Sequence, residues 1–395
     1  MADQPLHTET AAEPGFGQWV KIRRHLHQYP ELSGEEVETT AYIRARLEEL
    51  GIRIADAFKL RTGLVAEVGG LRPGPVIAIR ADIDALPVTE DTGLPYASAI
   101  PGSMHACGHD FHTAALIGTA HALKLREQEL SGTVRLIFQP AEEKAKGAQQ
   151  VVGSGALEGV AAIFGMHNKP DLPVGTIGIK EGPLMAAADG FVVQVRGKGT
   201  HAAVPEAGLD PIVAASHIVT ALQSIVSRNV GSLQSAVVSV TKFNSGTIWN
   251  VVPELAVLEG TIRTFEEGVR RRVLDRFRQV VEGTAASFGT EAELRFIEGP
   301  PPVHNDAALA ALGTQAAREA GYTAIVPVPS PAGEDFAVYQ RHVPGLFVFM
   351  GTNGTEEWHH PGFNLDEAAL PVSIAFFSRL AELALEQLAK GGEGL

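Results

Sequence analysis

The sequence predicts an α/β protein in which a smaller domain interrupts a larger one that has a mostly parallel sheet between helices. The length of 395 residues exceeds what a single compact core usually holds. Short apolar runs alternate with segments of helical spacing near both ends of the chain, as they do in α/β folds. Because this pattern changes in between, we expect an inserted domain at 187–298 and the two parts of the larger domain at 16–186 and 299–390.

The first part of the larger domain starts with two expected helices. Trp19–Leu26 and Glu35–Leu50 carry helical spacing, and Ser33 and Gly51 are the candidate N-cap and stop of the second helix. The apolar runs that follow are unbroken, which suits a sheet that is buried on both faces. Strands are expected at Leu64–Val68, Val76–Ala81, Val134–Phe138 and Ala161–Met166, with a helix at Thr113–Gln128.

The inserted domain begins with Phe191–Val195, where apolar and polar residues alternate as in a half-buried strand. Its extent of roughly 110 residues fits one small domain. Its helices are expected at Asp210–Arg228 and Glu267–Phe288, and its further strands at Ala236–Phe243, Ala256–Arg263 and Glu291–Phe296. The prolines Pro300–Pro302 then indicate a linker. After them the larger domain resumes with helices at Asp306–Ala320 and Ala368–Leu388 and a strand at Leu346–Met350.

Composition and charge narrow the classes of function. With 46 acidic against 32 basic residues, the chain has a formal charge of −14, which repels nucleic acid and anionic membrane surfaces. No stretch approaches the roughly 20 apolar residues of a membrane span. Residues 1–15 lack the features of a secretory signal and indicate a disordered lead-in. The single cysteine, Cys107, excludes an intramolecular disulfide, so we expect a cytoplasmic protein whose partner is a small molecule.

The strongest local signal is the segment Met104–His112, which holds the one cysteine and three of the fourteen histidines. Thiolate and imidazole groups are the ligands of borderline transition metals. We expect this segment to be a loop that enters the helix at Thr113. Because one Cys-x-His pair cannot hold a metal by itself, a buried thiol beside helix-capping histidines is the structural alternative.

Further candidate groups stand at the expected ends of three strands. Glu142 and Glu143 follow one strand directly, so that one carboxylate can bind a metal while the other accepts a proton. His167 ends a second strand, and the pair His359–His360 follows a third by a short loop. Taken one at a time, the Glu pair indicates a solvated helix start and each histidine a core or surface residue. Their shared position at strand ends favours one site at a single edge of the sheet.

These segments together resemble the bacterial N-acyl-amino-acid amidohydrolases and hippurate hydrolases, which have the plant auxin-conjugate hydrolases as relatives. The matching segments follow one another in order along most of the chain. They are Arg80–Pro87, Met104–Asp110, Gln139–Glu143, Gly199–His201, Asn250–Pro253, Gly260–Arg263, Glu334–Phe336 and His359–Pro361. The resemblance implies that the larger domain is catalytic and that the smaller one is a ferredoxin-like α+β domain acting as a lid or in dimerisation.

The resemblance also implies two divalent metal ions per subunit, for which zinc, manganese, cobalt and nickel all suit the ligand types. Of the histidine pair, His359 is the expected ligand, because the position of His360 varies among the relatives. Glu142 matches the general base of the family, which accepts a proton from the attacking water and returns it to the leaving amine. The implied ligands are Cys107, His109, Glu143, His167 and His359.

Other residues match positions around such a site. Asp82 stands where more distant peptidases carry a ligand histidine, which argues against a direct metal role for it. Asp84 is expected to orient a ligand, with a buried structural carboxylate as the alternative. In the inserted domain, His201 and Asn250 match residues aimed at the substrate, and Arg263 is placed to bind a carboxylate. Without the resemblance, His201 would be a loop histidine and Arg263 a charge on the surface of a strand.

The implied reaction is hydrolysis of the amide bond of N-acyl amino acids, in a homodimer or dimer-based oligomer where His201 completes the other subunit's site. A dipeptidase or carboxypeptidase on the same scaffold is the closest alternative, with Glu334 as the candidate partner of a free amine. An inactive binding protein is the remote alternative, and the presence of Glu142 and of every ligand argues against it. Phe111 and Pro331–Gly333 depart from the family pattern, which leaves the acyl group and the amino acid open.

Overall fold

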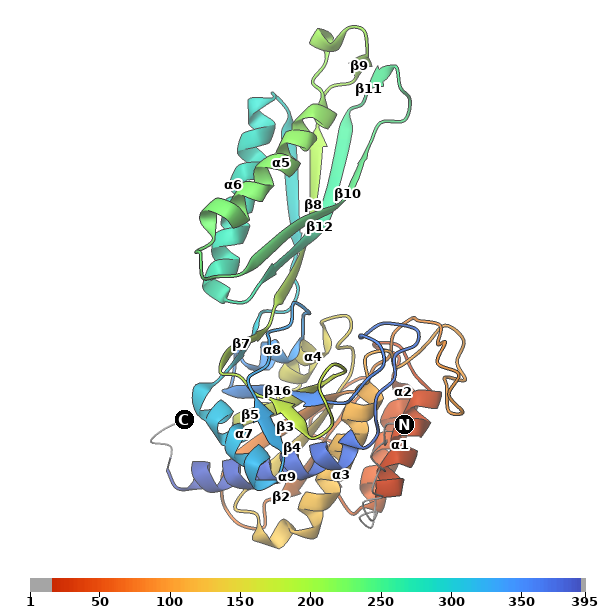
Figure 1. Cartoon of the computed structure of the whole chain (residues 1–395), viewed down its shortest axis with the longest axis vertical. Helices are drawn as coiled ribbons and strands as arrows, with labels where there is room; N and C mark the ends of the chain where they lie inside the picture. Colours follow the sequence, from red (N-terminus) through yellow and green to blue (C-terminus); the bar gives the residue numbers. More distant parts are fainter. Residues whose placement is uncertain (1–15, 392–395) are drawn as a thin grey trace, which may run out of the picture. The chain divides into compact units, whose positions relative to one another are not determined.

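The computed structural model describes residues 16–391, which form two compact units (Figure 1). The first unit contains the described residues up to Glu181, the stretch Asn305–Pro327, and the described chain from Tyr339 onward. The second unit contains Gly182–His304 and Val328–Val338. The lead-in expected at residues 1–15 lies outside the described residues. Within residues 16–391, no helix combines the length and the hydrophobicity that a membrane crossing requires.

The first unit is built on an eight-stranded sheet, which confirms the mostly parallel α/β architecture. Its central strands pair in parallel, β4 with β3, β3 with β5 and β5 with β16. Antiparallel pairs occur toward the edges, between β1 and β2, β2 and β4, and β16 and β6. In sheet order the strands are β1 (Arg53–Ile54), β2 (Leu64–Gly69), β4 (Thr133–Gln139), β3 (Val76–Asp82), β5 (Val160–Lys169), β16 (Gly345–Gly351), β6 (Thr176–Gly178) and β15 (Thr323–Ile325).

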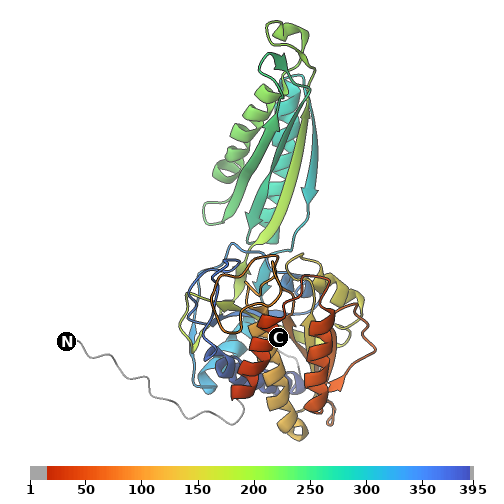
Figure 2. The same cartoon turned by 90° about the vertical axis from the view of Figure 1, so that its right-hand side faces the viewer.

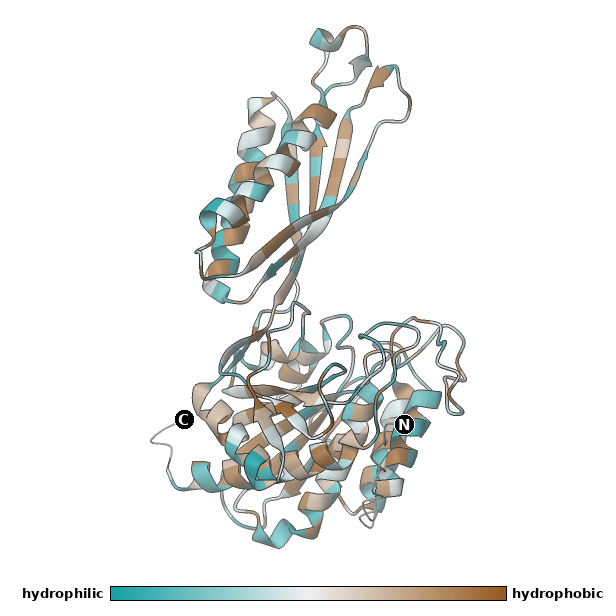
Figure 3. Cartoon of the chain, viewed as in Figure 1, coloured by the Kyte–Doolittle hydropathy of each residue, from teal (hydrophilic) through white to brown (hydrophobic). Residues whose placement is uncertain are grey.

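Alternation along the central strands divides their side chains between the two faces of this sheet. On β3, Ile77, Ile79 and Ala81 belong to the main hydrophobic core, whereas Arg80 and Asp82 point to the opposite face. Figure 3 shows the apolar residues that line the helices and strands of this unit. The helices that contribute to the core are α1 (Phe16–Gln28), α2 (Val37–Glu49), α3 (His109–Leu125), α7 (Ala307–Glu319) and α9 (Ala369–Ala389).

Several predicted helix starts differ from the structure, and two of the differences bear on the site. Helix α3 begins at His109 rather than Thr113, directly after Gly108, whose φ of 83° places the chain in the left-handed region that glycine tolerates. Helix α2 begins at Val37, and Ser33 does not cap it, because the Ser33 hydroxyl donates to Asp84 instead. Glu31 takes the capping role, since its carboxylate accepts hydrogen bonds from the backbone N–H groups of Glu38 and Thr39.

The second unit pairs a four-stranded antiparallel sheet with two long helices (Figure 2). Phe191, Val193 and Val195 of the central strand share a core with residues of both helices, so both helices cover the same face of the sheet. In sheet order the strands are β10 (Ala236–Ser245), β12 (Leu255–Thr264), β8 (Ala187–Arg196) and β13 (Glu291–Ile297), and the helices are α5 (Pro211–Asn229) and α6 (Glu267–Ser287).

Several short elements were not predicted, because two to seven residues carry too little periodicity to identify. In the second unit, β9 (Thr200–His201) and β11 (Val251–Val252) form a small antiparallel ribbon. Two further strands, β7 (Gly182–Met185) and β14 (Val303–Asn305), pair with each other. The remaining helices are α4 (Gly147–Gly153) and α8 (Phe336–Tyr339), with short 3-10 turns at Glu127–Glu129 and Pro205–Ala207.

Candidate metal centre and active site

The candidate metal ligands of the first unit gather at the carboxyl ends of its central strands. Cys107 lies two residues before α3, and His109 is the first residue of that helix. Glu143 follows β4, His167 lies near the carboxyl end of β5, and His359 follows β16 by a loop. Because β3, β4, β5 and β16 run in parallel, their carboxyl ends meet at one edge of the sheet.

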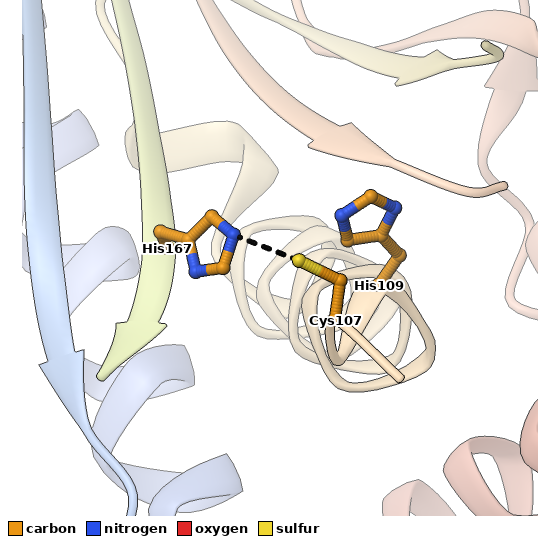
Figure 4. A group of neighbouring side chains, drawn as sticks. All are labelled: Cys107, His109 and His167. Atoms are coloured by element: carbon orange, nitrogen blue, oxygen red, sulfur yellow. Dashed lines mark hydrogen bonds between the residues drawn. The ribbon is translucent and has the colours of Figure 1, made fainter. Parts of the chain in front are cut away.

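Backbone carbonyl groups fix the rings of the two buried histidines. His109 Nδ1 lies 2.9 Å from the carbonyl oxygen of Asp84, and His167 Nδ1 lies 2.8 Å from that of Asn168. A carbonyl oxygen can only accept, so each Nδ1 carries a proton and each Nε2 is the nitrogen left for a metal ion. Nε2 of His167 faces the Cys107 sulfur at 3.4 Å (Figure 4). Both rings are therefore held in an orientation in which Nε2 can bind a metal.

Among the described residues, five groups of side chains bring their ligand atoms within 4.8 Å of one another, and three of them overlap around Cys107 and Glu143. Cys107 belongs to two of these groups, and Glu143 belongs to two as well. This sharing is the arrangement that two neighbouring cations need, because a common ligand keeps both close. The three overlapping groups are Cys107 with His109 and His167, Cys107 with Glu143 and His359, and His109 with Glu142 and Glu143.

His359 reaches this cluster from a backbone conformation that is unusual for its residue type. Its φ is 67°, in the left-handed region, and its N–H donates to the carbonyl of Ala106 at 2.8 Å. Its Nε2 lies 3.5 Å from a Glu143 oxygen. His360 belongs to none of the metal-binding groups found among the described residues, and its Nδ1 accepts the N–H of Gly362. The strain at His359 is of the kind that clusters at functional sites.

The charge and hydrogen bonding of the cluster fit divalent cations. Burial raises the pKa of the Cys107 thiol well above its ordinary value, and the carboxylates of Glu143 and Glu142 raise it further. Burial lowers the pKa of His109, but Asp82 and Asp84 outweigh burial and raise it to about 10. An environment this negative holds a proton and would equally hold a metal ion. Among the described residues, His109 Nε2 and Glu143 Oε1 are buried without hydrogen-bond partners, as unfilled ligand atoms would be.

Asp84 contacts His109 and also fixes the loop after β4. Its carboxylate accepts the backbone N–H groups of Glu142 at 3.1 Å and Glu143 at 3.0 Å, and the Ser33 hydroxyl at 2.6 Å. Burial alone would raise the pKa of Asp84, but the hydrogen bonds from His109 and Ser33 outweigh it and lower the pKa. The carboxylate therefore stays ionised and fixes the loop that carries Glu142.

Asp82 is engaged by other side chains. One of its oxygens pairs with Arg80 at 2.7 Å, and the other lies 2.6 Å from His112 Nδ1. His112 Nε2 in turn accepts the N–H of Asn168 at 2.9 Å. Sequence reasoning did not single out this buried network, although a charged residue inside the apolar run of β3 was a signal for it. The network joins β3, α3 and β5 directly behind the cluster.

In the second unit, His201 and Asn250 lie on the small ribbon. Val251 is paired with His201 between β11 and β9, and the N–H of Ala202 donates to the carbonyl of Asn250 at 3.0 Å. His201 is exposed, and its Nδ1 accepts the N–H of Ala203 at 3.1 Å. An Nδ1 that accepts leaves the proton of a neutral ring on Nε2. The exposed edge of His201 therefore presents a hydrogen-bond donor.

Arg263 lies in β12 of the same unit. Its Nε donates to the carbonyl of Pro331 at 3.1 Å, and its Nη1 donates to the carbonyl of Ile262 at 3.2 Å and to the Thr261 hydroxyl. The Pro331–Gly333 segment that departs from the family pattern therefore contacts Arg263. Of the guanidinium nitrogens, Nη2 has no hydrogen-bond partner within the described part of the chain.

Known proteins of one family are similar to this chain over most of its length. Residues 78–383 match the peptidase family M20/M25/M40. The chain is 55% identical to an N-acetylcysteine deacetylase of Bacillus subtilis over 98% of its own length and 100% of that protein. It is 39% identical to an IAA-amino acid hydrolase of Arabidopsis thaliana, covering 94% of this chain and 87% of the relative. A solved dinuclear metal-binding M20 peptidase of Bacillus subtilis superposes with a TM-score of 0.87 and 52% identity, over 95% of this chain and 99% of that one.

Proposed function

The chain belongs to the peptidase family M20/M25/M40 and is a metal-dependent amidohydrolase of N-acyl amino acids, and from this premise we propose how its residues act. The overlapping ligand groups around Cys107 and Glu143 would hold two divalent ions, and their overlap is the observation that carries the proposal. When bound, such a pair lowers the pKa of water and polarises the amide carbonyl. Zinc, manganese, cobalt and nickel all suit these ligands. The lone, buried thiol suits the reducing cytoplasm.

Glu142 is the general base in this proposal. It lies beside Glu143 and within 4.8 Å of His109 in ligand-atom distance, so its carboxylate is in reach of a water in the cluster. Glu142 accepts the proton of the attacking water and then donates it to the nitrogen of the leaving amino acid. Asp84 holds the backbone of both glutamates, so that Glu143 binds metal while Glu142 transfers the proton.

Residues of the second unit bind the substrate in this proposal. The Nη2 group of Arg263 offers two N–H donors to the α-carboxylate, because its other nitrogens are engaged within the unit. His201 donates from Nε2 to the oxyanion that develops on the carbonyl, and neighbouring Asn250 contacts the substrate. The buried Oδ1 of Asn250 has no hydrogen-bond partner among the described residues, which leaves it for a substrate N–H.

We propose that the working unit is a homodimer formed through the second unit. Strand β10 is at an edge of its sheet, and Val237 and Phe243 on it are exposed. At the tip of the ribbon, Trp249 is 91% exposed, which is costly for so large an apolar side chain. A second copy would cover these groups and place its own His201 at this chain's metal cluster. Sedimentation equilibrium tests the dimer, and a monomer at micromolar concentration would exclude it.

The acyl group we propose is a small one such as acetyl, in line with the relative that is named an N-acetylcysteine deacetylase. A dipeptidase would need a carboxylate for the substrate's free amine, and Glu334, which accepts the N–H of Phe336 at 2.8 Å, is the candidate for it. The test is metal analysis followed by hydrolysis rates for N-acetyl amino acids, N-acetylcysteine, N-benzoylglycine and dipeptides. We expect two metals per chain, loss of activity on chelation, and a preference for N-acetyl substrates. Faster hydrolysis of the dipeptides would overturn the substrate assignment.

A further inference from the structure

We infer that Glu36 is a positioning residue for the general base, which it serves by fixing the backbone of Ala141, the residue just before Glu142. This inference rests on the proposed role of Glu142 and deepens it. Glu36 lies 105 residues earlier in the chain, at the start of α2, and belongs to none of the metal-binding groups among the described residues.

The contacts of Glu36 are those of a backbone clamp. Its Oε1 accepts the N–H of Ala141 at 2.9 Å and the N–H of Gly34 at 2.8 Å. Its Oε2 accepts the Thr62 hydroxyl at 2.7 Å. The side chain is fully buried, and each of these partners is a neutral donor. Taking a carboxyl group out of water is costly, and here hydrogen bonds from three donors offset that cost.

Capping of α2 does not account for this buried charge. The first-turn N–H groups of Glu38 and Thr39 donate to Glu31, and the side chain of Glu36 makes no capping hydrogen bond. Glu36 instead turns to the loop after β4. Its role therefore concerns that loop rather than the helix that it precedes.

Ala141 has a backbone conformation that requires support. Its φ is 53°, in the left-handed region that residues with a Cβ rarely adopt. Its N–H and the N–H groups of Glu142 and Glu143 are three consecutive donors. All three are accepted by buried carboxylates, the first by Glu36 and the next two by Asp84. The direction of the Glu142 side chain depends on this turn.

The segment Ser33–Glu36 joins the two carboxylates. The Ser33 hydroxyl donates to Asp84, the Gly34 N–H donates to Glu36, and the Ser33 carbonyl accepts Lys144 Nζ at 2.8 Å. Without Glu36, the Ala141 peptide would lose its buried acceptor and the turn could relax toward the right-handed region. A displacement of Glu142 by about 1 Å is enough to cost up to a hundredfold in rate.

The test compares Glu36→Met, which removes both acceptors at similar size, with Glu36→Gln, which keeps an acceptor for Ala141. Thr62→Val is the matched control, because it removes only the contact to the other oxygen. At saturating metal we expect Glu36→Met to lower kcat by about 10- to 100-fold with KM nearly unchanged. Glu36→Gln and Thr62→Val should stay within about threefold of the wild-type kcat.

Amide hydrogen exchange of the peptide that covers residues 139–147 gives a readout that does not depend on the role of Glu142. We expect faster exchange there in Glu36→Met and near-normal exchange in Glu36→Gln. Unchanged exchange in Glu36→Met, or faster exchange with normal kcat, would overturn the inference. Equal loss of kcat in Thr62→Val would also overturn it, because the effect would then be general destabilisation. A failure of Glu142 as the base would be seen separately, as normal turnover in Glu142→Gln.

Discussion

Two histidines, one in each unit, show how the backbone assigns opposite tasks to the same side chain. His109 donates from Nδ1 to a carbonyl, so its Nε2 faces the buried carboxylates, where a metal ion can replace the proton that they hold there. His201 accepts an N–H at Nδ1, so its Nε2 offers a proton, and it does so on an exposed ribbon. The first arrangement suits a metal ligand and the second suits a donor to an oxyanion. The partner of Nδ1 therefore decides what each ring can do.

The surroundings of the two histidines differ as much as their tautomers. The cluster around His109 is completed by residues of its own unit, and carboxylates such as Asp84 hold its loops in place. The ribbon that carries His201 ends near the exposed Trp249 and offers no cluster of its own among the described residues. The candidate ligands are thus brought together within one unit, whereas the role proposed for His201 requires a second surface.

The largest effect should come from Glu142→Gln, which removes the proposed general base beside the His109 cluster. Turnover should fall by about 10²–10⁴, the usual contribution of a general base, because the amide cannot take the proton of the attacking water. Both metals should remain, since Cys107, Glu143 and the histidines are intact. Steady-state rates with metal analysis of the same sample check this. Near-normal turnover would remove Glu142 from the mechanism.

Arg263→Ala should weaken substrate binding by the second unit. We expect kcat/KM for N-acetyl amino acids to fall by about 10- to 100-fold, the loss of a charge-assisted hydrogen bond. The corresponding N-acetyl amino-acid amides lack the carboxylate and should be much less affected. Measuring both substrate series with Arg263→Ala and with Arg263→Lys separates charge from geometry. Equal losses for both series would indicate that Arg263 only supports Pro331 and its neighbours.

The reactivity of Cys107 tests whether the cluster in the first unit is strongly negative. As a metal ligand the sulfur should resist alkylation, and chelation should expose it to the reagent. Because burial and then Glu143 and Glu142 raise its thiol pKa, labelling of the metal-free protein should increase with pH and reach half its maximum above the pKa of free cysteine. Mass spectrometry is unambiguous here, since the chain has one cysteine. Identical labelling rates with and without metal would argue against ligation.

A further effect, on stability rather than on activity, concerns His105, whose ring nitrogens are buried without hydrogen-bond partners in residues 16–391. Burial lowers the pKa of His105 to about 4, below the value near 6.5 of an unfolded chain. The unfolded state therefore binds an extra proton between these values, and the free energy of unfolding falls on acidification from pH 6.5 toward 4, by on the order of 3 kcal/mol.

Replacing His105 with Phe should flatten this part of the stability profile, because Phe cannot take up the proton. The exposed His342→Gln is the matched control and should keep the wild-type slope. Urea unfolding at a series of pH values measures the difference. An unchanged slope in His105→Phe would mean that His105 does not stay neutral in the folded protein.

Much of the fold and of the cluster could be predicted from the sequence, because both depend on local signals. Buried strands such as β3 are unbroken apolar runs, and candidate ligands such as Glu143 and His167 stand near the ends of such runs. The clamp formed by Glu36 and the acceptance of Ser33 by Asp84 could not be predicted. They join polar residues far apart in sequence, which no periodicity connects, and Ser33 had a satisfactory local alternative as a helix cap.

Subunit exchange tests most directly whether His201 of one subunit serves the metal cluster of the other. Glu142→Gln and His201→Ala should each be inactive alone, the latter by about 10²–10³ through loss of the oxyanion donor. If His201 acts on the partner's cluster, a mixed dimer has one site with both defects and one with neither. An equal mixture should then recover roughly a quarter of the wild-type sites by symmetry. Subunit exchange demonstrated by differently tagged chains, without any return of activity, would contradict the account.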